Sequence, residues 1–388
     1  MRIAVNTRLL MKNKLEGIGW FTFETLKRIT QNHKEHEFLF IFDRTFSEEF
    51  IFTPNVKPYV LKPVTRHPFL WYIWFEHSIP SFLHKHNIDL FLSPDGYISL
   101  STRIPQISVI HDINFAHRPK DLPLLTRTYY NYYFPRFAHR ARRIATVSEY
   151  SKNDICNTYR VPSEKVDVVY NGAGAHYQPL NDAEKAKVKE EYMRGADYFI
   201  FVGSLHPRKN IPGLLSAFEA FKNETRSNIK LAIVGEVMFK TGEINSLLQK
   251  MNHREAVVFT GRKNAAELGR LLAGALALVF VPFFEGFGIP VVEAMYCDVP
   301  VIASNVTSLP EVAGDAALPA DPHSVDAIKN AMVQIAKDAQ LRNQLIEKAR
   351  EQRQKFTWDK SAARLWECIE KIRRSEEHTS ELQSLLII

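Results

Sequence analysis

Residues 277–293 read ALVFVPFFEGFGIPVVE, and this stretch decides the fold class. Its first five residues form an uninterrupted apolar run, which is typical of a strand buried in a parallel sheet. A Gly-x-Gly turn follows, and Pro290 then suits the first turn of a helix. A strand, a glycine-containing turn and a helix in direct succession predict one βα unit of a doubly wound α/β domain.

The same alternation of short apolar runs and helical periods extends in both directions from this unit. It predicts two tandem series of βα units, and therefore two doubly wound, Rossmann-like parallel-sheet domains with the ligand in the interdomain cleft. The expected strands are residues 3–5, 37–42, 90–92, 107–110, 143–147, 166–170, 198–202, 230–234, 257–260, 277–281 and 299–303.

Domain boundaries follow from the glycine-containing turn Asn171–Gly174. We expect a first domain at residues 1–178 and a second at 179–355, with a helix at about 356–374 returning to the first. Residues 375–388 keep no helical period and end in a bare apolar patch. They are therefore expected to be a non-native or disordered tail outside the fold.

Composition favours a cytoplasmic protein. The three cysteines (Cys156, Cys297 and Cys368) lie far apart, which excludes a disulfide scaffold and a CxxC-type zinc site. The longest apolar stretch, 272–284, is shorter than the roughly 20 residues that a membrane-spanning helix needs. The chain begins directly with an expected strand, so no signal peptide is expected.

Charge is distributed unevenly between the two expected domains. Residues 1–178 contain 23 Lys and Arg against 16 Asp and Glu, whereas residues 179–388 contain 27 of each. The whole positive excess therefore lies in the first half, where it would suit an anionic partner such as a membrane surface. A solvated surface without a target explains the charge equally well.

The segment Gly203–Asn210 directly follows an expected strand and precedes an expected helix. Free N–H groups and the helix dipole make such a turn an anion-binding site. Arg208 and Lys209 add a guanidinium fork and a point charge, both suited to phosphate oxygens. The segment lacks the GxxxxGK[ST] pattern of a P-loop, and a solvated basic turn is the alternative.

Two carboxylates, Glu285 and Glu293, flank the Gly-x-Gly turn and are expected to face one cleft. Gly286 and Gly288 allow the backbone to approach a ligand closely. Carboxylates accept hydrogen bonds from vicinal hydroxyls, so one could bind a sugar and the other a ribose. The alternative is that both are helix-start charges favoured by the dipole.

The arrangement Glu-Gly-Phe-Gly-Ile-Pro-x-x-Glu resembles the signature of retaining GT-B glycosyltransferases of family 4. The segments Gly17–Gly19, His111–Asp112, Val147–Glu149, Val169–Gly172, Gly203–Asn210 and Ser308–Glu311 occur in the order of that family, and the likeness reaches from Gly17 to about residue 372. Ser204 stands where many members carry Arg, and the Pro-Arg-Lys-Asn form resembles mannosyltransferase-like members. The resemblance implies transfer of a hexose from a nucleotide-sugar to an acceptor bound by the first domain, with the anomeric configuration retained.

The resemblance also implies the roles of individual residues. His111 would lie beside the donor sugar, although a purely structural histidine is the alternative. Arg208 and Lys209 would neutralise the departing diphosphate, while Glu285 would contact sugar hydroxyls and Glu293 the nucleotide ribose. The implied catalytic residues are His111, Arg208, Lys209 and Glu285; the implied donor-binding residues are Gly17, Gly19, Gly203, Arg208, Lys209, Gly235, Gly261, Arg262, Glu285, Gly286, Phe287, Gly288, Ile289 and Glu293.

We therefore expect a retaining hexosyltransferase that needs neither metal nor cofactor. The chain carries no Asp-x-Asp metal motif. GDP-mannose is the favoured donor and UDP-glucose the next, and the acceptor would be a saccharide or a lipid-linked saccharide in polysaccharide or lipopolysaccharide synthesis. The alternatives are a UDP-glucose-dependent glucosyltransferase, a nucleotide-sugar epimerase of the same fold, and a non-enzymatic donor-binding or scaffolding protein.

Two aromatic segments, His67–Phe75 and Tyr129–Phe137, lie in the basic half of the chain. They are interpreted first as helices packed in the core of the acceptor domain. Their amphipathic rings beside cations would also suit peripheral contact with the inner face of the membrane. No nucleic-acid-binding signature is present, so nucleic acid is not expected as a partner.

Overall fold

The computed structural model describes the backbone of residues 1–236 and 242–385, and side chains up to Ser375. The chain forms two compact units. The first contains residues 1–171 and the helix that begins at Trp358, and the second contains residues 172–357. These divisions lie a few residues from the boundaries expected from the sequence, 178/179 and 355/356.

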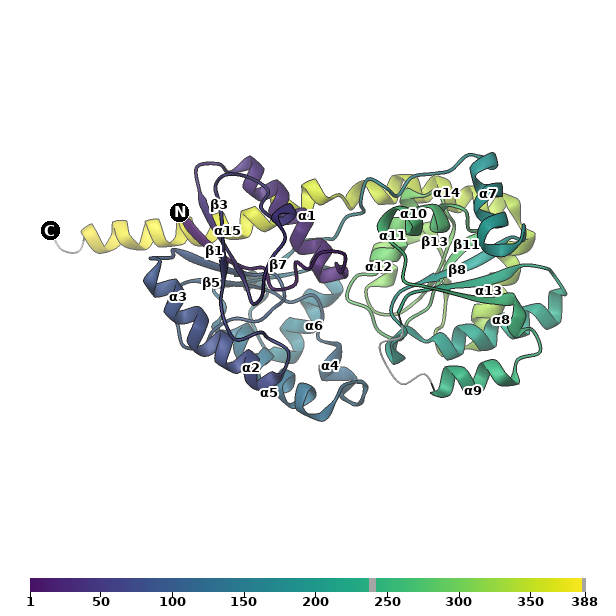
Figure 1. Ribbon diagram of the computed structural model, residues 1–388, viewed down its shortest axis with the longest axis horizontal. Helices are drawn as coiled ribbons and strands as arrows, with labels where there is room; N and C mark the ends of the chain where they lie inside the picture. The colour runs from purple at the N-terminus through teal and green to yellow at the C-terminus, as the bar shows by residue number, and fades with distance from the viewer. Residues whose placement is uncertain (237–241, 386–388) are drawn as a thin grey trace. The chain divides into compact units, whose positions relative to one another are not determined.

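The first unit is built on a seven-stranded sheet in which every neighbouring pair is parallel, in the order β3-β2-β1-β4-β5-β6-β7 (Figure 1). In register, Val5 of β1 lies between Phe40 of β2 and Leu92 of β4. The strands are β1 (Arg2–Asn6), β2 (Glu37–Phe42), β3 (Val56–Val60), β4 (Leu90–Ser93), β5 (Gln106–Val109), β6 (Arg143–Thr146) and β7 (Val166–Val168).

Alternate strand residues of this sheet enter two separate cores, because successive side chains point to opposite faces. Ala4 and Phe91 belong to one core, and Ile3 and Val5 to the other. The second core also includes Leu365 of the C-terminal helix, which packs along α1. The helices are α1 (Gly17–Asn32), α2 (Pro68–Ile73), α3 (Ile79–Lys85), α4 (Asn114–His117), α5 (Leu124–Arg140), α6 (Glu149–Tyr159) and α15 (Trp358–Leu385), with a π-helical turn at Trp74–Ser78.

The aromatic segments contribute mainly to the core, as the first interpretation predicts. Trp74, Phe75, Tyr129, Phe134 and Phe137 are buried there. Other members of the same region remain on the surface: Phe69, Tyr72, Leu124, Leu125 and Tyr132 are exposed by 64%, 39%, 64%, 61% and 51%. The region therefore combines a packed inner face with an apolar outer face.

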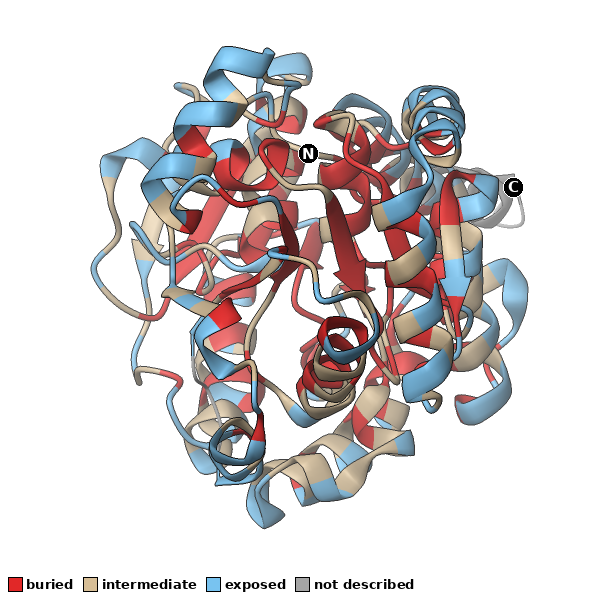
Figure 2. Cartoon of the chain, turned by 90° about the vertical axis from the view of Figure 1, so that its right-hand side faces the viewer, coloured by how far each residue is buried: buried red, intermediate tan, exposed pale blue. Residues whose placement is uncertain are grey.

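The second unit contains a six-stranded parallel sheet in the order β10-β9-β8-β11-β12-β13. Figure 2 shows the central strands of this sheet buried and the outward faces of its helices exposed, whereas the edge strand β10 is partly exposed. The strands are β8 (Tyr198–Val202), β9 (Lys230–Val234), β10 (Val257–Gly261), β11 (Ala277–Phe280), β12 (Val301–Ser304) and β13 (Ala317–Ala320). The helices are α7 (Asp182–Met193), α8 (Ile211–Thr225), α9 (Gly242–Lys250), α10 (Ala265–Ala273), α11 (Ile289–Tyr296), α12 (Leu309–Ala313), α13 (Val325–Lys337) and α14 (Ala339–Gln352).

The two parallel sheets confirm the expected doubly wound α/β class, and the differences from expectation are local. The edge strand β3 was not predicted, because Lys57 and Pro58 interrupt its apolar run; proline is tolerated at a sheet edge. The helical period of residues 325–356 predicts one continuous helix, but the structure divides it at Asp338. Asp338 has an extended backbone and caps α14 by accepting a hydrogen bond from the N–H of Leu341.

The C-terminal helix α15 continues to Leu385, beyond the end near residue 374 that the sequence analysis expects. The backbone of residues 375–385 is therefore helical, whereas residues 386–388 of the expected tail lie outside the described residues. Within the described part of the chain, no helix is both long enough and apolar enough to cross a membrane.

Candidate functional site

The second sheet changes direction between β8 and β11. The chain moves from β8 outward to β9 and β10, and then returns to place β11 on the other side of β8. Such a change of direction is a switch point, where the loops that follow the two neighbouring strands diverge. Open α/β sheets bind ligands there, at the carboxyl ends of the strands. The segment 203–210 follows β8, and the segment 281–288 follows β11. The two motifs singled out in the sequence therefore meet at one place.

The meeting point is an ion-pair cluster of two cations and one carboxylate. Arg208 Nη1 lies 2.7 Å from Glu285 Oε2, and Lys209 Nζ donates to the same oxygen. Arg208 also donates to the carbonyl of Phe284 at 3.0 Å, and its own carbonyl accepts from the N–H of Phe283 at 2.8 Å. The loop after β8 is thus bound to the loop after β11 through both side chains and backbone.

Glu285 is ionised in this cluster. Burial alone would raise the pKa of Glu285, but the charges and hydrogen bonds of Arg208 and Lys209 outweigh burial and lower it. All three side chains are largely withdrawn from solvent, with 12%, 19% and 8% of their surfaces exposed for Glu285, Arg208 and Lys209. With both cations charged, the cluster carries one net positive charge, which favours an anionic ligand such as a diphosphate.

Glycine is required where the loops after β8 and β9 touch. Gly235 has φ +152°, and a Cβ there would lie 1.9 Å from the carbonyl oxygen of Gly203. The N–H of Gly203 donates to Val234, and that of Gly235 donates to Gly261. The predicted residues Gly203, Gly235 and Gly261 therefore lie in sequence along one edge of the sheet, with their loops hydrogen-bonded to one another.

The loop after β11 leads into α11 through residues 286–289. Gly288 has φ +95°, a left-handed conformation that favours glycine, and a Cβ at this position would also lie 2.4 Å from Leu309 Cδ2. Gly286 and Phe287 are buried, and the Phe287 ring packs edge-on against Phe356 at 5.5 Å. Ile289 begins α11, whose first N–H groups have no partner within the helix and are suited to phosphate oxygens.

Glu293 lies one turn into α11, partly buried, and hydrogen-bonds with Tyr177. Burial raises the pKa of Glu293 to about 7. The carboxyl therefore titrates near neutral pH, unlike Glu285. Tyr177 was not identified from the sequence. It lies three residues after the glycine-containing turn Asn171–Gly174, and an aromatic residue with a polar tip in this irregular segment was the available signal.

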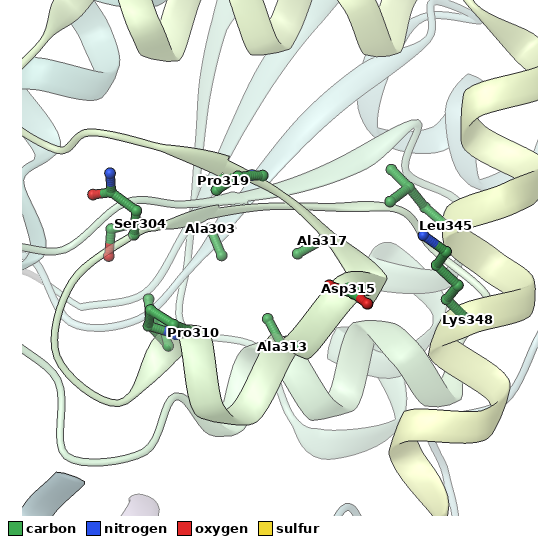
Figure 3. Close-up of a pocket in the computed structure, with 12 residues that line it drawn as sticks. Ala303, Ser304, Pro310, Ala313, Asp315, Ala317, Pro319, Leu345 and Lys348 are labelled. Atoms are coloured by element: carbon green, nitrogen blue, oxygen red, sulfur yellow. The ribbon is translucent and has the colours of Figure 1, made fainter.

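The loop at residues 307–308 is hydrogen-bonded to the backbone of Glu285. The Glu285 N–H donates to Thr307 Oγ1 at 3.3 Å, and Ser308 Oγ donates to the Glu285 carbonyl at 2.8 Å. The same loop borders a cavity of about 490 Å³ between β12, β13, α12 and α14. Figure 3 shows Pro310 and Ala313 on one side of it and Lys348 on another. None of Arg208, Lys209 and Glu285 lines this cavity.

The remaining predicted residue of this unit, Arg262, follows β10. Its Nη1 atom lies 3.7 Å from Glu236 Oε2, just beyond the carboxyl end of β9. Arg262 is therefore at the same edge as the ion-pair cluster but two strands away from β8. Its implied role in binding the donor stays a prediction.

Gly17, Gly19 and His111 belong to the first unit. Gly17 begins α1, and a Cβ on Gly19 would lie 3.3 Å from the Leu9 carbonyl oxygen, so the helix packs tightly on the preceding loop. His111 follows β5 and contacts the Phe21 ring of α1 edge-on at 5.0 Å. Burial lowers the pKa of His111, which keeps its ring neutral at pH 7.

Among the residues that the structure describes, no three His, Cys, Asp or Glu side chains come together as a possible metal site.

Comparison with known proteins identifies the family of this chain. Residues 16–174 match the model "Glycosyltransferase Family 4", and residues 182–352 match "Glycosyl transferases group 1". The chain is 32% identical over 254 residues to O-antigen chain mannosyltransferase B of Escherichia coli, covering 65% of this chain and 67% of that protein. It is 27% identical over 283 residues to O-antigen chain mannosyltransferase RfbU of Salmonella typhimurium, covering 73% and 75%.

Solved structures agree on the fold. HepE of Anabaena in complex with UDP-glucose superposes with a TM-score of 0.74 at 17% identity, covering 96% of this chain and 100% of that one. WaaG, a glycosyltransferase involved in lipopolysaccharide biosynthesis, gives 0.72 at 16% identity, covering 93% and 98%. The two family models together span most of the chain, and both sheets are parallel, as expected. The chain belongs to glycosyltransferase family 4 and has the GT-B fold.

Proposed function

We propose that this glycosyltransferase moves a mannosyl residue from GDP-mannose to a saccharide or lipid-linked saccharide, with retention of the anomeric configuration. The observation that carries the proposal is the cluster of Arg208, Lys209 and Glu285 at the switch point of the second sheet. Glycosyl transfer from a nucleotide-sugar creates negative charge on the departing diphosphate, and fixed cations at that position stabilise the transition state.

In the proposed reaction, the diphosphate lies against Arg208, Lys209 and the N–H groups of Gly288 and Ile289. The two cations supply the positive charge that the leaving group needs, so we propose transfer without a metal or a cofactor. Glu285 Oε1 would accept hydrogen bonds from hydroxyls of the donor sugar. The carboxylate would thus bind sugar and cations together, which orients the anomeric carbon relative to the leaving oxygen.

Retention follows in this proposal from attack on the face that the diphosphate leaves. The acceptor hydroxyl approaches the anomeric carbon as the bond to the diphosphate oxygen breaks, and that oxygen receives the hydroxyl proton. No enzyme nucleophile takes part. Catalysis is then mainly electrostatic and positional, which matches a site built from ion pairs and backbone N–H groups.

The remaining donor contacts in the proposal come from Glu293 and from His111. Glu293, when ionised, would accept hydrogen bonds from the ribose hydroxyls, replacing its contact with Tyr177. His111 would contact the transferred sugar. The Gly17–Gly19 turn would lie against the diphosphate, and Gly235, Gly261 and Arg262 would border the base.

Mannose is favoured because the two curated relatives reported above are mannosyltransferases by name. The similarity to HepE with UDP-glucose is too distant in sequence to define a donor. Purified protein offered GDP-mannose or UDP-glucose with a lipid-linked saccharide acceptor, with and without EDTA, tests the proposal. We expect an α-linked mannosyl product, identified by the one-bond carbon–proton coupling at its anomeric carbon, in both conditions. Glucose transfer or epimerisation of the donor without acceptor would support the corresponding alternative, and a β-linked product would contradict retention.

We also propose a peripheral membrane contact, at the inner face of the membrane, through the apolar outer face of α2 and α5. Phe69 and Leu124 are each 64% exposed, which is unusual for side chains of this size. The exposed Arg136 lies over the ring of Tyr132 at 3.5 Å. Exposed apolar and aromatic groups beside cations suit the interface of an anionic bilayer, where a lipid-linked acceptor would be found.

A further inference from the structure

The first sheet has a switch point of its own, between β1 and β4, and it too carries a buried ion pair. Arg8 follows β1 by two residues and Asp95 follows β4 by two residues. Arg8 Nε donates to Asp95 Oδ2 at 2.6 Å, and only 7% and 4% of the two side chains are exposed. The proposed reaction does not use either residue.

Asp95 is held from several directions. Asn6 Nδ2 donates to Asp95 Oδ1 at 2.8 Å, Ser93 Oγ at 3.1 Å, and the N–H of Tyr97 at 3.4 Å. Because Oδ2 accepts from Arg8, both carboxylate oxygens are used. The Arg8 guanidinium lies 4.3 Å from the centre of the Tyr97 ring. The pair therefore fixes the turn 93–97 to the end of β1.

This arrangement is more than packing requires. Taking two charges out of water costs several kcal/mol per ion, and apolar side chains of similar volume are often equally stable in such positions. Burial opposes the charge on Arg8, but the attraction of Asp95 outweighs it and raises the pKa of Arg8. An ion pair maintained at this cost, at the edge of a sheet where ligands bind, suggests a role in positioning.

The turn that the pair fixes is in direct contact with His111. The carbonyl oxygen of Pro94 lies 2.8 Å from His111 Nε2. A carbonyl can only accept, so Nε2 must carry the proton and donate. In the neutral ring, Nδ1 is then an unprotonated acceptor. The edge-on contact with Phe21 restricts the ring from the other side.

We propose that the Arg8–Asp95 pair is a positioning device that, through the Pro94 carbonyl, holds His111 in the tautomer with an unprotonated Nδ1. In this form Nδ1 accepts a hydrogen bond from a hydroxyl of the transferred sugar and cannot donate to an oxyanion. The sugar contact rests on the proposed function, whereas the control of the tautomer does not.

The tautomer is tested first, without substrate, by long-range ¹H–¹⁵N correlation of the histidine rings, with the His111 signals assigned from their loss in His111→Gln. We expect one tautomer, protonated at Nε2, in the wild type and a mixture in Asp95→Asn. Asp167→Asn is the matched control. Its ion pair with Arg143, also at 2.6 Å, lies in the same unit and does not contact His111. An unchanged tautomer in Asp95→Asn overturns the proposal, whatever the enzyme transfers.

The sugar contact is tested by a double-mutant cycle on transfer. We expect Asp95→Asn to lower kcat by about tenfold or more in the wild-type background and to have no further effect in His111→Gln, since it acts through His111. Equal losses in both backgrounds would assign Asp95 a general structural role and overturn the proposal. Should Asp95→Asn not fold, Arg8→Lys keeps the charge but changes the fork geometry, and it is expected to show the same two effects. If Asp95→Asn loses the fixed tautomer but the wild type transfers no sugar, only the proposed function is refuted.

Discussion

Substitution of Glu285 by glutamine separates the two roles assigned to the cluster at the second switch point. Glu285→Gln keeps the shape of the side chain but removes its negative charge. Arg208 and Lys209 both meet the same carboxylate oxygen, so the substitution leaves two cations without their counter-charge in a largely buried place. We expect the protein without nucleotide to become less stable, and a nucleoside diphosphate to replace the missing charge.

The size of the effect follows from the burial of the cluster. Removing one partner of a buried ion pair costs about 3–5 kcal/mol. Because 8–19% of these side chains remains exposed, we take about 3 kcal/mol. For a unit of this size the melting temperature should then fall by roughly 6–12 °C.

The effect on nucleotide binding comes from the repulsion between the Glu285 carboxylate and a bound phosphate. Two unit charges 4 Å apart interact by about 4 kcal/mol at an effective dielectric constant of 20. Hydration of the phosphate and the carboxylate offsets most of this repulsion. We therefore expect its removal to tighten nucleoside diphosphate binding about tenfold, which corresponds to about 1.4 kcal/mol.

Calorimetric titration with GDP and UDP, thermal melting and transfer assays measure the three consequences. We expect Glu285→Gln to melt at lower temperature, to bind the nucleoside diphosphate more tightly, and to transfer sugar about 100-fold more slowly or worse. Glu224→Gln is a control, since Glu224 pairs with Lys329 at 2.7 Å on the surface of the same unit. Weaker nucleotide binding by Glu285→Gln, or an unchanged melting temperature, would refute the assignment of the two cations to the diphosphate.

Four further predictions follow from the geometry. Lys209→Ala should reduce turnover about 100-fold or more in a transfer assay, and near-native activity in the folded variant would remove its role. The pKa of Glu293 is about 7 in the native state, whereas its ordinary value is 4.5. Between pH 4.5 and 7 the native state therefore keeps a proton on Glu293 that the unfolded chain has released. Stability to urea should therefore fall by up to about 3 kcal/mol from pH 4.5 to 7, and Glu293→Gln should abolish the fall; an equal fall in the variant would contradict this. Gly235→Ala should prevent normal folding, measured by near-ultraviolet circular dichroism, because its Cβ would overlap the Gly203 carbonyl; a native spectrum and stability would contradict the close approach. Replacing Phe69 and Leu124 by serine should weaken sedimentation with anionic liposomes while melting is unchanged, and unchanged binding would remove the proposed membrane contact.

The sequence was informative wherever one strand pattern was strong. The strand Glu37–Phe42 was predicted at its observed bounds, because all but its first residue are apolar and buried. The division of the helix at Asp338 was not predicted, since helical periodicity continues on both sides of it. Edge strand β3 was missed for a similar reason: an edge position tolerates Lys57 and Pro58, which are unfavourable in a central strand.

The convergence of the site could be predicted because each motif directly follows a strand. Arg208 and Glu285 are 77 residues apart, yet each follows one of the two neighbouring strands at the switch point. The Tyr177–Glu293 contact could not be predicted, because Tyr177 lies on an irregular segment whose path depends on tertiary packing. Arg8 and Asp95 lack a distinctive motif, and only the strand order shows that they meet.

The most direct test of the account is a thermal-shift titration with GDP, UDP, ADP and their sugar conjugates, in parallel for wild type and an Arg208→Ala, Lys209→Ala double variant. A ligand at about 100 times its Kd should stabilise the wild type by roughly 2.7 kcal/mol. We predict this stabilisation for the guanine nucleotides and its loss in the double variant. No stabilisation of wild type by any nucleotide, or equal stabilisation of wild type and variant, would contradict the claim that the cluster at the second switch point binds the diphosphate.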